Sequence, residues 1–267
     1  MPLQTIVLLG AIAGFTIYLG LPLARVKSLK QGVKGFLSML ATGVLLFLLV
    51  DVTTKMLEPI EEALTSVAKE PQNLTAGLGL LGLMVVGLLV GLVGIVVLGT
   101  GFHRKKPEAG KAPGEPHEIK PETLSLIIAV GIGAHNLSEG LAIGQAASSG
   151  ALSLAWVLII GFGLHNMTEG FGIAGPLTGR PVSWRFLGLL GLIGGGPTFL
   201  GTLLGISVHS SALFVFSLAF AAGAILYVVA ELLGMARRFT RPVVAWGVLV
   251  GFLLGLGTDL ILTVAGV

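Results

Sequence analysis

The sequence predicts an all-α integral membrane protein with eight transmembrane helices. Of its 267 residues, 54% are apolar and 11% are charged, whereas about a quarter of the residues in a soluble domain are charged. Backbone that faces lipid must satisfy its own hydrogen bonds, so long apolar segments are expected to form helices. Segments of the ~20 apolar residues that a span requires occur eight times. They are Leu3–Ala24, Gly35–Met56, Leu74–Gly99, Glu122–Ala147, Leu152–Leu177, Trp184–Val208, Ala212–Met235 and Pro242–Val264.

The distribution of basic residues predicts the orientation. Of the 16 Lys and Arg, all except Lys55 and Lys69, in the loop after the second span, fall on one side of an eight-span arrangement. Basic loops remain in the cytoplasm, so this side is predicted to be cytoplasmic and both termini extracytoplasmic. The first span ends in basic residues rather than at a small-residue cleavage site, which favours a retained helix over a signal peptide. We expect one multi-pass domain, residues 1–267, in the cell (inner) membrane.

Two segments interrupt the apolar pattern. Residues 100–121 are rich in Pro, Lys and Glu, which predicts a flexible cytoplasmic linker. The linker carries His103 and His117; a solvated role is favoured over a transient metal contact, because two histidines are too few for a site. In the sixth span, Gly194–Pro197 reads GGGP. Proline removes a helical hydrogen bond and glycine weakens the turn, so we expect this helix to be broken or kinked.

A polar motif is repeated in the fourth and fifth spans. Residues 133–140 read GAHNLSEG, and residues 163–170 read GLHNMTEG. On a helix, His and Glu four residues apart lie on one face, with Asn at its edge. Ionisable groups inside a membrane helix cost roughly 2.5–3.5 kcal/mol each on insertion scales, so they normally mark a pathway or a ligand site.

Six side chains of the repeated motif are predicted to converge at the middle of the bilayer, because the two spans are antiparallel. Neutral imidazole with carboxylate suits Zn²⁺, Fe²⁺, Mn²⁺, Co²⁺ or Ni²⁺ better than Ca²⁺ or Mg²⁺. Two ionised glutamates would balance one divalent charge, and the chain has no cysteine to supply a thiolate. The candidate metal ligands are His135, Asn136, Glu139, His165, Asn166 and Glu169.

Three other interpretations of the motif are open. The His and Glu of each copy could form hydrogen-bonded pairs that brace a helix interface, although Asn recurs at the same offset in both copies. An intramembrane metal-dependent hydrolase could use the same ligands to activate water, but it needs a separate base, and no His-Glu-x-x-His is present. A bis-His haem membrane protein would use His135 and His165 as axial ligands, which leaves both glutamates without a role.

The sequence resembles the ZIP (Zrt/Irt-like) family of divalent metal transporters, most closely its prokaryotic branch. The resemblance rests on two His-Asn-x-x-Glu-Gly motifs on successive helices, on the eight spans and on the basic loop after the third span. The resemblance implies a transport site on the fourth and fifth helices at the midplane, movement of metal toward the cytoplasm, and termini outside. It also suggests a homodimer. The residues that it carries over are His135, Asn136 and Glu139 from one helix and His165, Asn166 and Glu169 from the other.

Two features depart from the family pattern. Ser138 and Thr168 stand where many relatives carry proline before the motif glutamate, and their hydroxyls can bond the carbonyl one turn back. Gly196 stands where binuclear relatives carry a glutamate. We therefore expect one principal metal ion, held mainly by His135, Glu139, His165 and Glu169.

The predicted function is import of divalent transition metal by alternating access, with Zn²⁺ favoured and Fe, Mn, Co, Ni or Cd as alternatives. We expect no enzymatic activity, no catalytic cofactor and no nucleic-acid partner. No Gly-x-x-x-x-Gly-Lys-Ser/Thr motif is present, so gradients rather than a nucleotide would drive transport.

Glu231, near the cytoplasmic end of the seventh span, either lies on the exit pathway or reaches out to water. Asp51 and Asp259 are either an acidic entrance or solvated helix ends.

Overall fold

A computed structural model of the chain describes residues 2–26, 30–94, 96–97, 120–148, 152–208 and 210–264. Every regular element in these ranges is helical, which confirms the predicted all-α class. The main helices are α1 (Leu3–Phe15), α2 (Ile17–Gly20), α3 (Gln31–Thr65), α4 (Asn73–Leu89), α6 (Pro121–Ser148), α7 (Leu152–Ala174), α8 (Trp184–Gly205), α9 (Ser211–Met235) and α10 (Arg241–Val264). Short helical turns extend them at Leu21–Arg25, Ser66–Ala68, Val90–Gly94, Gly175–Leu177 and Ala236–Arg238.

The helices follow the order of the predicted spans. Over the described residues, seven helical segments are long and apolar enough to cross a membrane. α7, a helix of 23 residues, stands where the fifth span is predicted. Most of the predicted linker, with His103 and His117, lies outside the described residues. The chain is therefore a multi-pass membrane protein, and its regular structure is helical throughout the described ranges.

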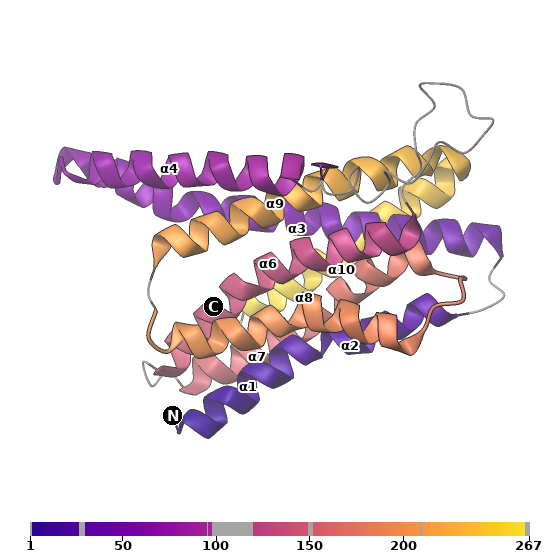
Figure 1. The fold of residues 1–267 in the computed structure, drawn as a ribbon, viewed down its shortest axis with the longest axis horizontal. Coiled ribbons are helices and arrows are strands. Elements are labelled where there is room, and N and C mark those ends of the chain that lie inside the picture. The colour runs from indigo at the N-terminus through magenta and orange to yellow at the C-terminus, as the bar shows by residue number, and fades with distance from the viewer. Residues whose placement is uncertain are drawn as a thin grey trace.

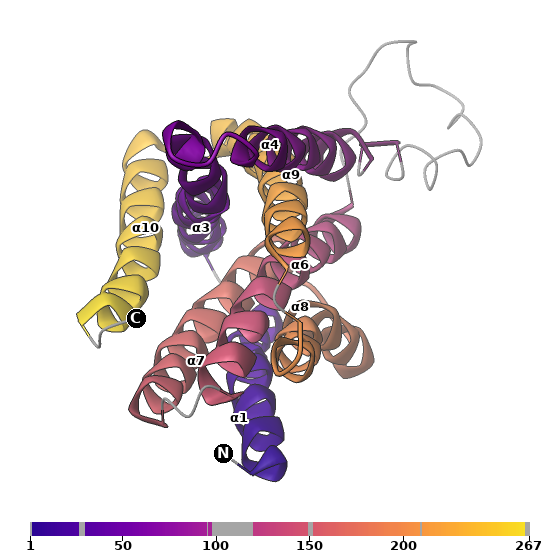
Figure 2. The ribbon, with the colours of Figure 1, turned by 90° about the vertical axis from the view of Figure 1, so that its left-hand side faces the viewer.

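The helices form two groups that pack side by side (Figures 1 and 2). α1, α6, α7 and α8 make up one group, and α3, α4, α9 and α10 the other. The groups meet where α6 contacts α9 and where α7 contacts α3 and α10. In its most apolar stretch α6 buries 72% of its residues, against 17% for α4 and 22% for α10. The first motif helix is thus central, whereas α4 and α10 are peripheral.

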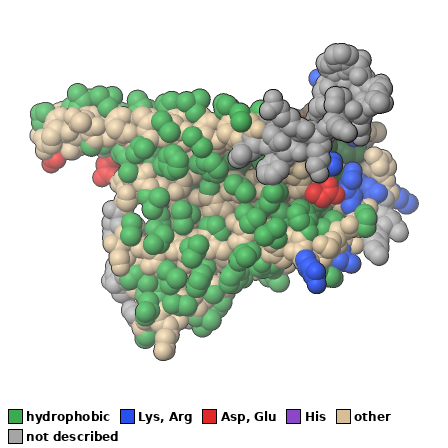
Figure 3. All heavy atoms as spheres, viewed as in Figure 1, with side chains coloured by type: hydrophobic (Ala, Val, Ile, Leu, Met, Phe, Trp, Pro, Cys, Tyr) green, Lys and Arg blue, Asp and Glu red, His purple; other side chains and the backbone are tan. Residues whose placement is uncertain are grey.

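Charge is distributed unevenly between the two ends of the bundle. Both chain termini lie at the same end, at the left of Figure 1. On the face shown in Figure 3, Lys and Arg side chains gather at the opposite end, and the broad surface between the ends is apolar. This arrangement is typical of a membrane protein whose ends face two different aqueous sides.

Helix α3 is longer than the second predicted span. It continues past Met56 to Thr65 and carries Pro59 inside it. The acidic residues after Met56 end the apolar pattern but do not end the helix. Lys55, which the charge analysis counted with the loop at the end of this span, therefore lies well inside α3.

Helix α8 is continuous through Pro197, so of the break or kink predicted at Gly194–Pro197 the break is wrong. Proline cannot donate a hydrogen bond to the carbonyl four residues earlier, which belongs to Ile193. The backbone of α6 lies directly against this carbonyl, because a Cβ atom on Gly133 would collide with the Ile193 oxygen. Close packing with α6 therefore supports α8 across the missing hydrogen bond.

Glycines allow the motif helices to approach their neighbours closely. A Cβ atom on Gly140 of α6 would collide with the Thr198 carbonyl oxygen of α8. Gly170, the equivalent residue of α7, lies in the same way against the Ile17 carbonyl oxygen of α2. Small residues at helix contacts let backbones touch inside a membrane. Each of these glycines directly follows a motif glutamate, so the contacts fix the position of both glutamates in the bundle.

Candidate metal centre

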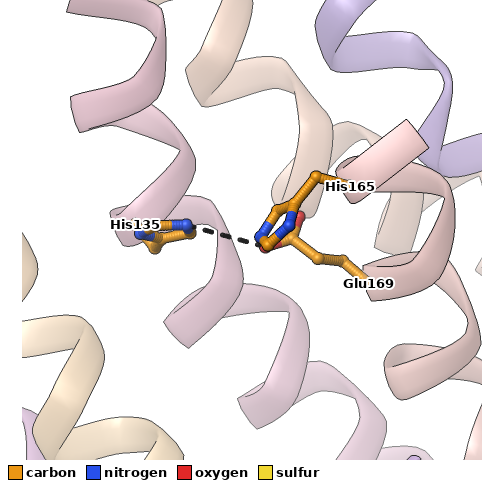
Figure 4. Close-up of side chains that lie close together, drawn as sticks. All are labelled: His135, His165 and Glu169. Carbon is orange, nitrogen blue, oxygen red and sulfur yellow. Dashed lines mark ion pairs between the residues drawn. The ribbon is translucent and has the colours of Figure 1, made fainter. Parts of the chain in front are cut away.

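The six motif side chains come from the middle of two neighbouring helices and are buried together. α6 carries His135, Asn136 and Glu139, and α7 carries the second copy. All six residues are between 0% and 4% exposed. Figure 4 shows His135 facing His165 and Glu169 across the contact between the two helices. The predicted convergence of the two motifs is therefore present in the fold.

Both imidazoles lie close to both carboxylates. His135 Nε2 is 3.2 Å from Glu139 Oε1 and 4.0 Å from Glu169 Oε1, the contact marked by the dashed line in Figure 4. His165 Nε2 is 3.9 Å from Glu139 Oε1 and 3.7 Å from Glu169 Oε1. The two ring centroids are 5.9 Å apart. The contacts therefore run between the copies as well as within them, so the bracing of each helix by a separate pair does not describe the cluster.

The spacing suits a transition-metal ion. One ligand atom each from His135, His165 and Glu169 lies within 4.8 Å of the other two. Ligand atoms around a tetrahedral ion with bonds of ~2.1 Å are about 3.4 Å apart. Glu139, whose Oε1 is 3.2 Å and 3.9 Å from the two Nε2 atoms, can supply a fourth ligand. The ligand atoms of His135, His165 and Glu169 thus approach the spacing of a tetrahedral site, and Glu139 lies beside this group of three.

Buried polar atoms without a hydrogen-bond partner are concentrated at this cluster. A polar group buried in this way costs free energy unless something else satisfies it. A cation between the helices would satisfy nitrogen and oxygen lone pairs at the same time. Among the described side chains, the atoms concerned are His135 Nδ1 and Nε2, Asn136 Oδ1, Glu139 Oε2, His165 Nε2, Asn166 Oδ1 and Glu169 Oε1, with Thr198 Oγ1 as the one such atom beyond the motifs.

Thr258 of α10 orients one of the imidazoles, and sequence reasoning did not identify it. Its Oγ1 lies 3.3 Å from His165 Nδ1 and donates a 2.8 Å hydrogen bond to the Gly255 carbonyl. Since the hydroxyl proton is used in this bond, Oγ1 is available to accept a hydrogen bond from Nδ1–H. His165 then carries its proton on Nδ1 and presents the lone pair of Nε2 to the glutamates, as a metal ligand requires.

The motif asparagines link the cluster to neighbouring helices. Asn136 Nδ2 donates to Glu169 Oε2 at 2.9 Å and to the Gly194 carbonyl of α8 at 3.0 Å. Asn166 Nδ2 donates to the Ala13 carbonyl of α1 at 2.9 Å. Asn136 therefore fixes which oxygen of Glu169 faces the imidazoles.

The hydroxyls that replace the relatives' proline bond their own helices, as predicted. Ser138 Oγ donates to the His135 carbonyl at 2.6 Å, and Thr168 Oγ1 donates to the His165 carbonyl at 2.7 Å. Gly196 is buried in α8 and has no side chain to offer a ligand. Glu231 is partly exposed on α9 and is not among the residues whose ligand atoms converge.

Comparison with known proteins gave one finding. A family model described as ZIP Zinc transporter matches residues 100–258 of the 267-residue chain. A search of curated proteins found no match. The matched segment covers more than half of the chain and includes both motifs and Thr258.

Proposed function

Because the chain belongs to the ZIP zinc transporter family, we propose that it imports divalent transition-metal ions, Zn²⁺ most readily, into the cytoplasm. The observation that carries the proposal is the buried convergence of His135 and His165 with a glutamate from each motif. Proteins of this family transport divalent metals, and the chain is a multi-pass membrane protein of that kind.

The donor set favours a transition metal over Ca²⁺ or Mg²⁺. Imidazole nitrogen is a good ligand for Zn²⁺, Fe²⁺, Mn²⁺, Co²⁺ and Ni²⁺, whereas Ca²⁺ and Mg²⁺ prefer oxygen alone. The two carboxylates balance the charge of one divalent ion in a low-dielectric interior. One principal ion is proposed, held by His135, Glu139, His165 and Glu169. The amide oxygens of Asn136 and Asn166 are further ligands as the ion enters or leaves.

The charge distribution supports the proposed orientation of the chain, and the direction of transport is the one that membership of the family implies. Lys and Arg gather at the end of the bundle away from both termini. Since basic ends remain in the cytoplasm, we propose that both termini lie on the outer side of the cell (inner) membrane. Metal would reach the centre from the side of the termini and leave toward the basic end by alternating access around α6 and α7. Glu231, partly exposed one turn before the end of α9 at Met235, is a candidate for the exit pathway.

Metal uptake into proteoliposomes tests the proposal. The full chain is reconstituted, and initial rates are recorded for Zn²⁺, Mn²⁺ and Fe²⁺, for wild type beside Glu139→Ala and His165→Ala. The expected result is saturable uptake that both substitutions abolish, with elution volume and helical content unchanged. Metal that binds stoichiometrically to the wild type but never crosses the membrane would overturn the proposal in favour of a metalloenzyme or a sensor.

A further inference from the structure

A second group of charged side chains lies beside the metal ligands, on α3 and α10. The Lys55 ammonium is 2.9 Å from Asp51 Oδ1 and 3.0 Å from Asp51 Oδ2, so it contacts both oxygens of this carboxylate. It is also 4.0 Å from Asp259 Oδ1 of α10. The Asp51 side chain is 8% exposed, whereas those of Lys55 and Asp259 are 33% and 28% exposed. The group thus extends from the protein interior to its surface.

The helix register places this group directly next to the motif. Phe47, Asp51 and Lys55 are spaced by four residues and therefore share one face of α3. The Phe47 ring meets the His165 ring edge-on at 6.4 Å. On α10, Asp259 directly follows Thr258, which contacts His165 Nδ1. Both helices run from this contact toward the end of the bundle that holds the termini, so the group lies on that side of the ligands.

The charges of the two groups act on one another. The Lys55 ammonium carries a positive charge on the side of the motif that faces the termini, 2.9 Å from the Asp51 carboxylate. Charges interact more strongly across a protein interior than through water. An ion that approaches Glu139 from the side of the termini therefore meets the positive charge of Lys55 before it meets the ligands.

We propose that Lys55 is a tethered cation on the outer approach to the metal centre, and that an incoming divalent ion must displace its ammonium from Asp51 and Asp259. This inference rests on the proposed transport function and orientation. Carboxylates that hold an ammonium also bind divalent metal. The flexible four-carbon chain of Lys lets its ammonium move into water when the metal takes its place. Lys55 thereby sets the metal concentration at which uptake begins, and Asp51 and Asp259 receive the ion first.

The first test compares the KM for Zn²⁺ among variants at Lys55. Lys55→Met removes the charge and keeps the length, and it should lower KM about fivefold with little change in kcat, since one repelling unit charge is lost. Lys55→Arg keeps the charge and binds carboxylate in a bidentate manner, so its KM should equal or exceed that of the wild type. Lys69→Met is the matched control, because Lys69 is exposed in the turn between α3 and α4 and its loss should leave KM unchanged.

A second measurement uses the wild-type protein and does not depend on the folding of a variant. A water-soluble amine-acylating reagent is applied in detergent with and without saturating Zn²⁺, and labelling at Lys55 and Lys69 is quantified by mass spectrometry. Displacement of the ammonium into water should raise the labelling rate of Lys55 several-fold and leave that of Lys69 unchanged.

The outcomes separate this inference from the proposed function. If wild type shows no saturable uptake, or if Glu139→Ala transports normally, the function itself is wrong. If uptake is saturable and sensitive to Glu139→Ala, an unchanged or raised KM in Lys55→Met overturns the role of Lys55 alone. An equal drop in KM in Lys69→Met would also overturn it, because Lys55 would then contribute only to the surface charge. Labelling of Lys55 that does not respond to Zn²⁺ would overturn it too, because Lys55 would then be part of a structural ion pair.

Discussion

The two copies of the motif carry the same polar side chains, but their neighbours support them differently. In the second copy, Thr258 orients His165, and Glu169 accepts a hydrogen bond from Asn136. In the first copy, both ring nitrogens of His135 lack a hydrogen-bond partner among the described residues. Glu139 Oε2 lacks one as well. The imidazole and the carboxylate of the α7 copy are therefore each held by a side-chain hydrogen bond from a neighbouring helix, and those of the α6 copy are not. If the proposed function is right, substitutions in the two copies should have unequal effects on metal binding.

Replacing each glutamate by glutamine should give the largest difference between the copies. In Glu169→Gln, Asn136 Nδ2 still requires an acceptor, so the new amide must turn its oxygen to Asn136 and its NH₂ to the metal. In Glu139→Gln, the side chain can present its oxygen to the ion. We expect Zn²⁺ affinity to fall about 100-fold or more in the first variant and about tenfold in the second.

Equilibrium Zn²⁺ titration of the purified proteins measures these affinities. Glu61→Gln is the control for loss of one negative charge, because Glu61 is exposed on α3 and its replacement should leave the affinity unchanged. Equal losses in the two motif variants would show that the hydrogen bond from Asn136 does not distinguish the copies.

Substitution of the motif glycines tests whether the copies are equally constrained by packing. A Cβ atom on Gly140 or on Gly170 would collide with a backbone oxygen of a neighbouring helix. Gly140→Ala and Gly170→Ala should each lower the free energy of unfolding by roughly 1–3 kcal/mol. The measurement is denaturant-induced unfolding in detergent micelles.

The matched control for the glycine variants is Gly82→Ala on α4, where an added Cβ would meet no atom within 4 Å. That variant should be neutral or more stable by about 0.5–1 kcal/mol, because alanine favours the helix. If Gly140→Ala and Gly170→Ala were as stable as Gly82→Ala, the close backbone contacts of the motif helices would be disproved.

Thr258→Val tests the anchoring of His165 more selectively. Valine has nearly the same shape as threonine but cannot accept the hydrogen bond from Nδ1–H, so the imidazole loses its fixed tautomer. Loss of such a supporting contact typically costs metal affinity about tenfold. Thr263→Val on the exposed end of α10 is the control. An unchanged Zn²⁺ affinity in Thr258→Val would show that a contact other than Thr258 orients His165.

The smallest predicted effect is that of pH on the wild type. Metal binds the neutral imidazole and carboxylate forms, so protons compete with it, and uptake must fall as the pH is lowered. Initial uptake should fall about threefold or more between pH 7.5 and pH 5.5, because protons occupy the lone pairs that the metal needs. Both sides of the vesicle are kept at the same pH, and a zinc ionophore verifies that the probe still responds. A flat profile from pH 8 to pH 5 would contradict competition at these ligands.

The part of this site that follows from spacing along a single helix could be predicted from the sequence. His and Glu four residues apart had to share a face, and the repeat on two antiparallel spans brought the faces together. The support from Thr258 could not be predicted, because it depends on how α10 packs against α7. The bond from Asn136 to Gly194 depends in the same way on α8.

Two expectations failed because local composition was given too much weight. Gly194–Pro197 predicts a broken helix when α8 is considered alone, but α6 packs against the affected turn and the helix continues. Charged residues after Met56 ended the second predicted span, yet α3 continues to Thr65. The contact between Asp51 and Lys55 is an i,i+4 pair inside the predicted span, whereas the approach of Asp259 depends on how α10 packs against α3.

The glycine contacts also have a mechanical consequence. Where α6 meets α8 and α7 meets α2, backbone lies on backbone, so these pairs cannot slide past each other by a change of side-chain rotamer. Gly43 of α3 and Gly251 of α10 form the same kind of contact in the other group. Between the groups, Phe47 and Thr258 touch His165 through side chains alone. The molecule is therefore expected to be stiff within each group and more compliant along the boundary beside His165.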